Sequence, residues 1–488
     1  MISVTRTQIL FLCAATMLVG GLGGCAAVPD LGPKPVPLAS QDVAAERSLA
    51  GEAGEWPQDS WWTAYGDPQL DRLIAEGLQN SPDTAAAAAR FRKAVGYARQ
   101  AGAPSLPSVD VTGSAAFNKQ SYNNGFPKEF VPKGWLDTGN VSVGLGFDLD
   151  IWGKNRAALA AAVSEVKAAQ YDARQARLML ATGIADAYAD LARLYEERDI
   201  RKSTLDIRMA SQKLVVQRQR NGLETQGSVK QADANVSSAR ADLAAAEEAI
   251  ALRSNQIAAL VGAGPDRGLS LERPQLSAPA MRGLPPGVTT DLLSRRPDIG
   301  AALARLEAAA SRIKVARADF FPAIRLDALI GYQALGLDQL IERDSIQGNV
   351  GPAISLPIFH GGALGGQYRV ARATYDEAVA DYDGTVLSAY RDVADAVTSR
   401  AMLAQRLKDA RDALTASEQA LDIARLRYDG GLSSYIDVLN VEDRMLATRE
   451  AVAELEARAL TLDIALIRSL GGGFLPSDIP DPKDDTDG

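Results

Sequence analysis

The sequence predicts an internally duplicated α+β membrane protein, built from long antiparallel helices and four amphipathic strands. The expected helices are several times longer than those of globular domains. Four segments alternate apolar with small or polar residues, over the length at which a strand crosses a bilayer. The two halves of the chain repeat the same order of elements at an offset of roughly 200 residues.

The chain begins with a segment typical of a lipoprotein export signal. Arg6 is the only charge before Cys25, and Leu22-Gly23-Gly24 directly precede this cysteine. The apolar run before them is too short for a membrane-spanning helix. We therefore expect residues 1–24 to be a removed signal peptide and Cys25 to be the lipidation site. The alternative is an ordinary secretory signal with a chance cysteine.

A proline-rich stretch follows the expected lipidation site. Residues 25–60 should form a lipidated, extended N-terminal linker without a core of its own. Three tryptophans follow and are expected to tie this linker to the body of the protein: Trp56, Trp61 and Trp62.

The composition argues against catalysis, metal binding and nucleic-acid binding. The chain has two cysteines, Cys13 and Cys25, and one histidine, His360. Cys13 leaves with the signal and Cys25 should be acylated, so the mature chain lacks the residues for a His/Cys metal cluster or a Ser-His-Asp site. A net charge of −9 gives no electrostatic basis for binding nucleic acid. We expect no enzyme activity, no metal, and no cofactor beyond the lipid on Cys25.

Helical periodicity covers most of the remaining chain. We expect helices at 68–103, 153–221, 228–262, 296–318, 361–429 and 434–470. The tract 153–221 would be on the order of 100 Å long. Apolar residues at heptad spacing give these tracts a seam for a partner helix: Leu439, Leu446, Ala453, Leu460 and Ile467. This pattern fits a plain coiled coil as well as a helical tube.

Strand pairs are expected at about 109–150 and 323–359. In the first pair, Val141, Val143 and Leu145 alternate with Ser142, Gly144 and Gly146. This alternation is typical of a transmembrane β-barrel, although a soluble two-layer sheet shows it too. Four strands are too few to close a barrel, and open strand edges cannot face lipid. If the strands lie in a membrane, several chains must therefore join to close the barrel.

The internal repeat defines two units, 61–265 and 285–474. Arg220-Asn221-Gly222-Leu223 in the first resembles Asp429-Gly430-Gly431-Leu432 in the second. Gly222 and Gly431 stand where a long helix must end, and glycine suits a left-handed C-terminal cap. Each unit should therefore contain a strand pair and a helical hairpin, with helix-tip turns near 222 and 431. The acidic segment 475–488 is expected to be a disordered tail.

Several short motifs point to a family. They are Trp61–Asp71 (WWTAYGDPQLD), Arg295–Ile299 (RRPDI), Phe320–Pro322, Arg427–Gly431 and Leu470–Phe474. Over 56–474 the chain resembles the outer-membrane factor family of tripartite (RND-type) efflux systems, and in particular the TolC-type, NodT-like outer-membrane lipoproteins.

The resemblance implies a homotrimer in the bacterial outer membrane. Each chain would add four strands to a transmembrane β-barrel, and a long antiparallel α-helical barrel would continue it into the periplasm. Such a trimer is a passive conduit for drugs or other small molecules. Its implied partners are a periplasmic membrane-fusion adaptor protein, an inner-membrane efflux pump and outer-membrane lipid.

The resemblance also implies a gate at the periplasmic helix tips. Asp437 matches the first acidic gate position of the family, and Asn440 occupies the second, where some members have Asp. Tyr428 matches a tip tyrosine that holds the gate shut by hydrogen bonding in relatives. Ser433 stands where some relatives carry Arg, and Gly227 is the matching acidic position of the first hairpin. Ser434-x-x-Asp437 is also a helix-capping pattern, so Asp437 has a structural explanation as well.

The main alternative is a lipid-anchored periplasmic coiled-coil adaptor or scaffold protein. Such a protein would share the lipid anchor, the long helices and the hairpin tips. It would lack the two strand pairs placed symmetrically in a duplicated chain.

Overall fold

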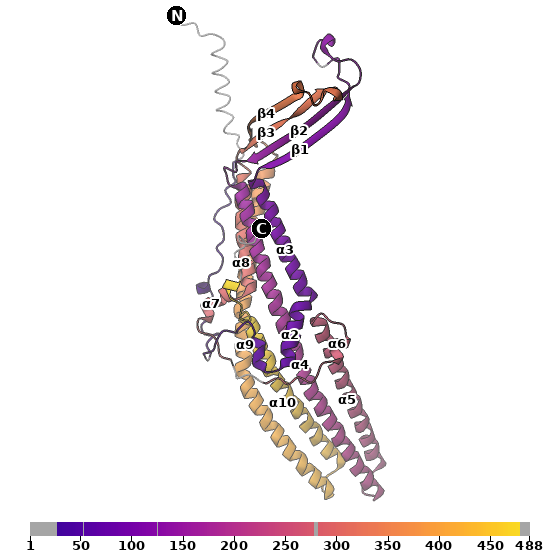
Figure 1. Cartoon of the computed structure of the whole chain (residues 1–488). Coiled ribbons are helices and arrows are strands. Elements are labelled where there is room, and N and C mark those ends of the chain that lie inside the picture. The colour runs from indigo at the N-terminus through magenta and orange to yellow at the C-terminus, as the bar shows by residue number, and fades with distance from the viewer. Residues whose placement is uncertain (1–26, 52, 124, 278–281, 479–488) are drawn as a thin grey trace.

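The molecule is long and narrow, with a β-sheet at one end and two helical hairpin tips at the other (Figure 1). The computed structural model describes residues 27–51, 53–123, 125–277 and 282–478. The predicted signal peptide, the lipidation site Cys25 and residues 479–488 of the tail lie outside the described residues. Within the described ranges, no helix is both long and apolar enough to cross a membrane.

Two strand pairs alternate with helices along the chain. The first half contains α2 (Pro68–Asn80), α3 (Pro82–Gly102), β1 (Ser108–Asn118), β2 (Leu136–Asp148), α4 (Lys154–Arg220), α5 (Gln226–Leu260) and α6 (Asp266–Leu269). The second half contains α7 (Val288–Arg295), α8 (Pro297–Ala318), β3 (Ala323–Leu335), β4 (Ile346–Ser355), α9 (Ala363–Asp429) and α10 (Tyr435–Ser469). The predicted α+β fold class with four strands is confirmed.

The two hairpins have identical helix lengths. The long helices α4 and α9 each contain 67 residues, and the returning helices α5 and α10 each contain 35. The same number of positions separates Lys154 from Ala363, Gly222 from Gly431, and Gln226 from Tyr435. This agreement shows the internal duplication directly.

The tract 68–103, predicted as one helix, is two helices. Ser81 adopts an extended backbone and ends α2, and its hydroxyl accepts the N–H of Asp83 at 3.3 Å. Pro82 then occupies the first position of α3, where its missing N–H costs nothing. The Ser-Pro pair therefore divides the tract.

The four strands form one antiparallel sheet in the order β1-β2-β3-β4. The register aligns Val111 with Val143, and Val143 with Ile330, on one face. On the other face it aligns Thr112 with Ser142, Ser142 with Gly331, and Gly331 with Gln347. The sheet therefore has one apolar face and one polar face, and β1 and β4 are its open edges.

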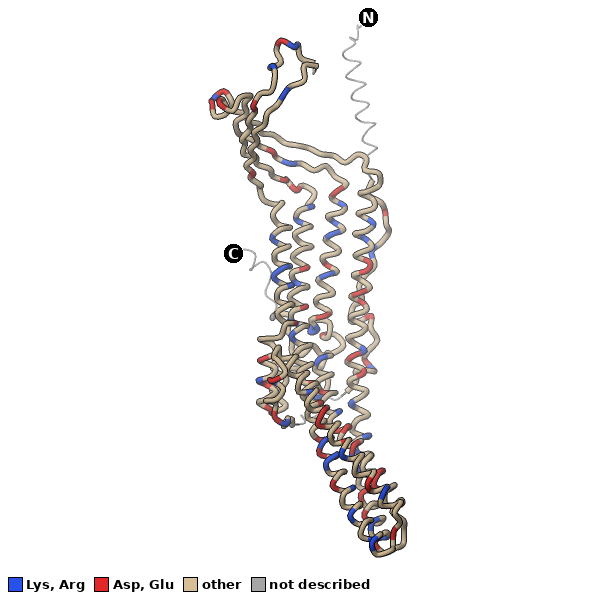
Figure 2. Tube along the Cα trace, turned by 90° about the vertical axis from the view of Figure 1, so that its right-hand side faces the viewer, with Lys and Arg blue, Asp and Glu red and all other residues tan. Residues whose placement is uncertain are grey.

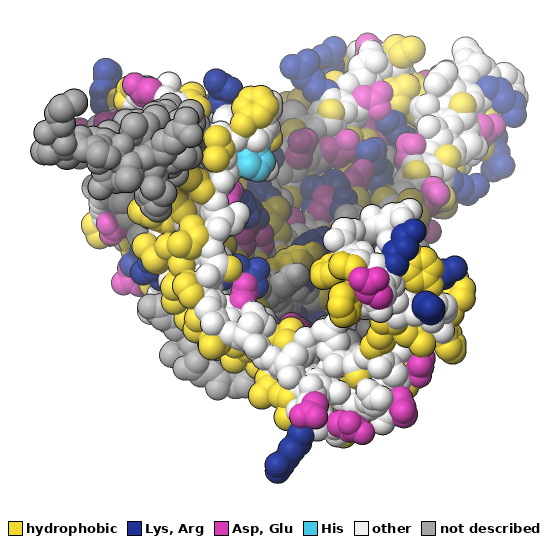
Figure 3. Space-filling view, turned by 90° about the horizontal axis from the view of Figure 1, so that it is seen from above, with side chains coloured by type: hydrophobic (Ala, Val, Ile, Leu, Met, Phe, Trp, Pro, Cys, Tyr) yellow, Lys and Arg dark blue, Asp and Glu magenta, His cyan; other side chains and the backbone are white. Residues whose placement is uncertain are grey.

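The polar face belongs to the inside of a curve. Seen from above, the chain bends around a hollow, and hydrophobic side chains gather along the outer side of the bend (Figure 3). Valines on the apolar face are exposed in the single chain, among them Val109, Val111 and Val350. An apolar outer surface of this kind requires lipid or a partner to cover it.

The N-terminal arm is packed more firmly than an extended linker. Arg372 on α9 donates to the carbonyl oxygens of Gly32 and Pro33, and Tyr375 donates to that of Pro35. Further along, Ala45 and Leu49 join a buried cluster. The arm is thus tied to α9 and contributes to a shared core near α7.

Candidate gate at the helix tips

Both hairpin tips use the same turn. Gly222 and Gly431 adopt left-handed φ angles of +72° and +74°. The N–H of Leu223 bonds to the carbonyl oxygen of Arg218, and that of Leu432 bonds to the carbonyl oxygen of Arg427. These bonds satisfy carbonyl groups that the ending helices leave free. The structure thus places Gly222 and Gly431 at the tips, in the conformation that the sequence predicts.

The returning helices begin with side-chain caps. In the first hairpin, the Thr225 hydroxyl accepts the N–H of Ser228 at 3.1 Å. In the second, the Asp437 carboxylate accepts the backbone N–H of Ser434 at 2.9 Å and its hydroxyl at 2.7 Å. Ser228 and Asp437 are both the third residue of their helix. The residue that corresponds to Asp437 in the first hairpin is therefore Ser228. The prediction that Gly227 corresponds to Asp437 is wrong by one position.

Asp437 and Asn440 lie one helical turn apart on the exposed side of α10. The hydroxyl and the N–H of Ser434 hold the pKa of Asp437 below its ordinary value, so the carboxylate is charged. The capping explanation of Asp437 thus matches its contacts. A gating role for these two residues stays a prediction, because it depends on partner subunits.

Tyr428 joins the two tips. Its side chain is only 2% exposed, and its hydroxyl donates to Glu224 Oε1 in the first tip at 2.9 Å. The guanidinium of Arg218 lies over its ring, 4.5 Å from the centroid. Burial, and then the hydrogen bond to Glu224, raise the pKa of this tyrosine. Tyr428 was predicted from the sequence, whereas its partners Glu224 and Arg218, which lie on the other hairpin, were not.

Ser433, at the position where the resemblance implies Arg in some relatives, does not connect the two hairpins by a side-chain hydrogen bond. Its hydroxyl is buried, and no described residue hydrogen-bonds to it.

A charged cluster lies above the tips, where the hairpins pack together. Arg208 on α4 contacts Glu442 and Asp443 on α10. This cluster was not predicted from the sequence. The sequence does contain an indication of it. Tyr435, Val438, Glu442 and Met445 follow at helical spacing, which places one acidic residue among buried apolar positions of α10. Charged residues are frequent along the lower hairpins (Figure 2), so this acid does not stand out by composition.

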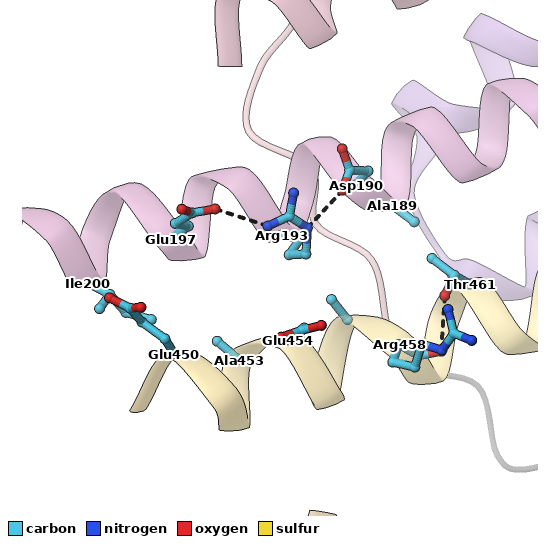
Figure 4. Close-up of a pocket in the computed structure, with 11 residues that line it drawn as sticks. Ala189, Asp190, Arg193, Glu197, Ile200, Glu450, Ala453, Glu454, Arg458 and Thr461 are labelled. Carbon is cyan, nitrogen blue, oxygen red and sulfur yellow. Dashed lines mark hydrogen bonds and ion pairs between the residues drawn. The ribbon is translucent and has the colours of Figure 1, made fainter. Parts of the chain in front are cut away.

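Higher still, a groove of about 360 Å³ separates α4 from α10. Figure 4 shows Ala189 and Ala453 on facing helices, with Arg193 bonded to Asp190 and Glu197 beside them. Alanines and charged side chains line this groove, so the two hairpins are not close-packed at this level. Within the described part of the chain, no three His, Cys, Asp or Glu side chains are placed to hold a metal.

The comparisons agree with this architecture. A family model for outer membrane efflux proteins matches residues 73–263 and 288–472. The chain is 30% identical over 467 residues to the pyoverdine export outer membrane protein OpmQ of Pseudomonas aeruginosa, covering 95% of this chain and 97% of that protein. It is 27% identical over 462 residues to a probable outer membrane lipoprotein, SilC of Salmonella typhimurium, covering 93% and 97% of the two chains.

Solved structures agree as well. The outer membrane protein VceC of Vibrio cholerae is 45% identical and superposes with a TM-score of 0.81, covering 86% of this chain and 100% of that one. The chain therefore belongs to the outer membrane efflux protein family.

Proposed function

We propose that three copies of this chain form the outer-membrane exit channel of a tripartite efflux system, which passively conducts small molecules from a pump to the exterior. The observation that carries the proposal is the four-stranded sheet with one apolar face, one polar face and two open edges. Unpaired edges in lipid cost several kcal/mol per backbone group, so the edges of β1 and β4 must pair with other copies. Three copies give a barrel of the usual transmembrane size, with the polar face inside.

The hairpin tips provide the surface for a periplasmic adaptor. Leu223 and Leu432 directly follow the two turn glycines and are 63% and 74% exposed. Apolar side chains at the far end of both hairpins favour contact with another protein. The adaptor would connect the tips to an inner-membrane pump, which supplies the energy.

The tips also close the channel. Tyr428 links the second hairpin to Glu224 of the first, and Asp437 and Asn440 would face the axis just above the turn. In a trimer, three charged Asp437 side chains would repel one another unless cations offset the repulsion.

The lipid on Cys25 serves delivery and tethering. The arm that follows Cys25 is held along α9, and the relative SilC is named a probable lipoprotein. On a protein whose strands already sit in the membrane, the lipid is a second anchor.

Planar-bilayer recording tests this function. The purified protein should migrate as a heat-modifiable trimer from outer-membrane fractions and give discrete conductance steps. A periplasmic adaptor or scaffold would wash out of delipidated membranes as a monomer and give no steps, and this result would contradict the proposal.

A further inference from the structure

A buried ion pair joins the two hairpins, with one partner roughly 18 Å from the end of α4 and the other roughly 10 Å from the start of α10. Arg208 Nη1 on α4 lies 2.8 Å from Glu442 Oε1 on α10, and these residues are 8% and 1% exposed. Arg208 also contacts Asp443, and Arg425 on α9 lies 3.6 Å from Glu442. Ser211 donates to Glu442 at 3.3 Å. The cluster therefore connects the first hairpin to both helices of the second.

Apolar side chains pack against the buried side of this pair. Val438 and Met445 flank Glu442 on the buried side of α10, and Val215 lies two turns below Arg208 on α4. Arg208 Nη1 and Glu442 Oε1 are close, yet neither has a well-aligned hydrogen-bond partner among the described residues. Burial raises the pKa of Glu442, although Arg208 and Arg425 oppose the shift. The charged form of Glu442 is thus less stable here than in water.

A buried ion pair in these surroundings contributes little to the stability of the folded protein. Well-packed apolar residues in place of a buried ion pair are often neutral or stabilising, whereas removal of one partner is strongly destabilising. Both charges favour a state in which the hairpins separate and water reaches them. The two hairpins are therefore joined by a contact that aligns them but adds little to their stability.

We propose that Arg208 and Glu442 set the ease of opening, as a second gating element above the Tyr428–Glu224 contact. The pair fixes how the hairpins align when closed, and its cost of desolvation keeps the closed state close in free energy to the open state. This inference rests on the proposed channel function. The Arg208–Glu442 pair provides an ionic contact between the two hairpins, which the uncharged Ser433 cannot provide.

The test compares single and paired substitutions in the full-length trimer in planar bilayers. Arg208→Met leaves the buried Glu442 with only Arg425, 3.6 Å away, and Ser211, so the open probability should rise about tenfold or more. Glu442→Met leaves Arg208 paired with Asp443, so the rise should be smaller. The combined variant, Arg208→Met with Glu442→Met, removes both charges and should open less often than the wild type. Its apolar packing also keeps it folded if either single variant proves unstable.

A matched control uses an exposed pair of the same chemistry. Arg411 lies 2.6 Å from Glu456 within the second hairpin, and both side chains are about half exposed. Arg411→Met with Glu456→Met should leave the open probability unchanged.

The outcomes separate the two proposals. If the wild type conducts and the single variants only melt at a lower temperature, the pair is structural and the inference is wrong. It is equally wrong if the combined variant opens as often as the single ones. A wild-type trimer without conductance would overturn the channel function and this inference together.

Discussion

At the scale of single residues, the contact between Tyr428 and Glu224 is the most specific link between the tips. Tyr428→Phe removes the hydroxyl and with it the hydrogen bond to the partly exposed Glu224 carboxylate, at a cost of roughly 1 kcal/mol. We expect a higher open probability in planar bilayers, with the trimer intact on gels. Tyr97→Phe, at an exposed position on α3, is the control. Equal conductance in both variants would remove Tyr428 from the gate.

Asp437 gives a prediction about ions. Its carboxylate is charged, so three copies near one axis would bind divalent cations. Asp437→Ala should lower the block of conductance by divalent cations, and Asn440→Asp should strengthen it. Because the pKa of Asp437 is lowered, the block by the wild type should persist at pH 5. Unchanged block in Asp437→Ala would leave this residue with its capping role only.

Asp186 on α4 gives a pH-dependent prediction. Burial raises its pKa to about 6, and Arg468 opposes the shift only in part. The folded state therefore binds this proton more tightly than the unfolded state, so stability falls as the pH rises from the unfolded pKa of 3.8 to the folded pKa of about 6, and the full penalty is present above pH 6. Asp186→Asn should stabilise each chain by roughly 3 kcal/mol at pH 7.5, and so raise the melting temperature there, and should have little effect at pH 4. Asp206→Asn, at an exposed position of the same helix, should change neither value.

At the scale of elements, the two faces of the sheet should tolerate different substitutions, because one face is apolar and the other is polar. Val143 lies on the apolar face and Gln347 on the polar face. Val143→Lys should place a charge in lipid at a cost of about 2–4 kcal/mol per chain, and so reduce the yield of membrane trimers. Gln347→Lys should assemble normally. The yield of heat-modifiable trimer measures both, and equal yields would mean that the apolar face does not meet lipid.

Elements with a local pattern were predictable from the sequence. The alternation in β2 and the glycines at 222 and 431 depend on near neighbours, and the structure agrees with both. The break at Ser81 was missed because helical periodicity continues across it. The Arg208–Glu442 pair could not be predicted, since it depends on how two hairpins more than 200 residues apart pack together. The candidate gate was therefore only partly predictable from the sequence.

At the scale of the whole molecule, the proposed barrel and the proposed lipid would be separate attachments to the membrane. Cys25→Ala combined with a conventional signal peptide should still give membrane-integral trimers, because the strands hold the protein in the bilayer. Extraction with carbonate, followed by electrophoresis without heating, measures this. Release of the variant into the soluble fraction would show that lipid was the only anchor.

The equal length of the two hairpins has a consequence for stoichiometry. In the proposed trimer, six tips would reach the same level and form a ring with nearly sixfold geometry. Their surfaces alternate, however, because Glu224 and Ser228 in one tip correspond to Ser433 and Asp437 in the next. A partner ring of six identical subunits would have to bind two kinds of tip surface, whereas a ring of three subunits could bind one kind only. Duplication has thus given the proposed trimer six equivalent backbone positions at the tips, but only three copies of each kind of tip surface.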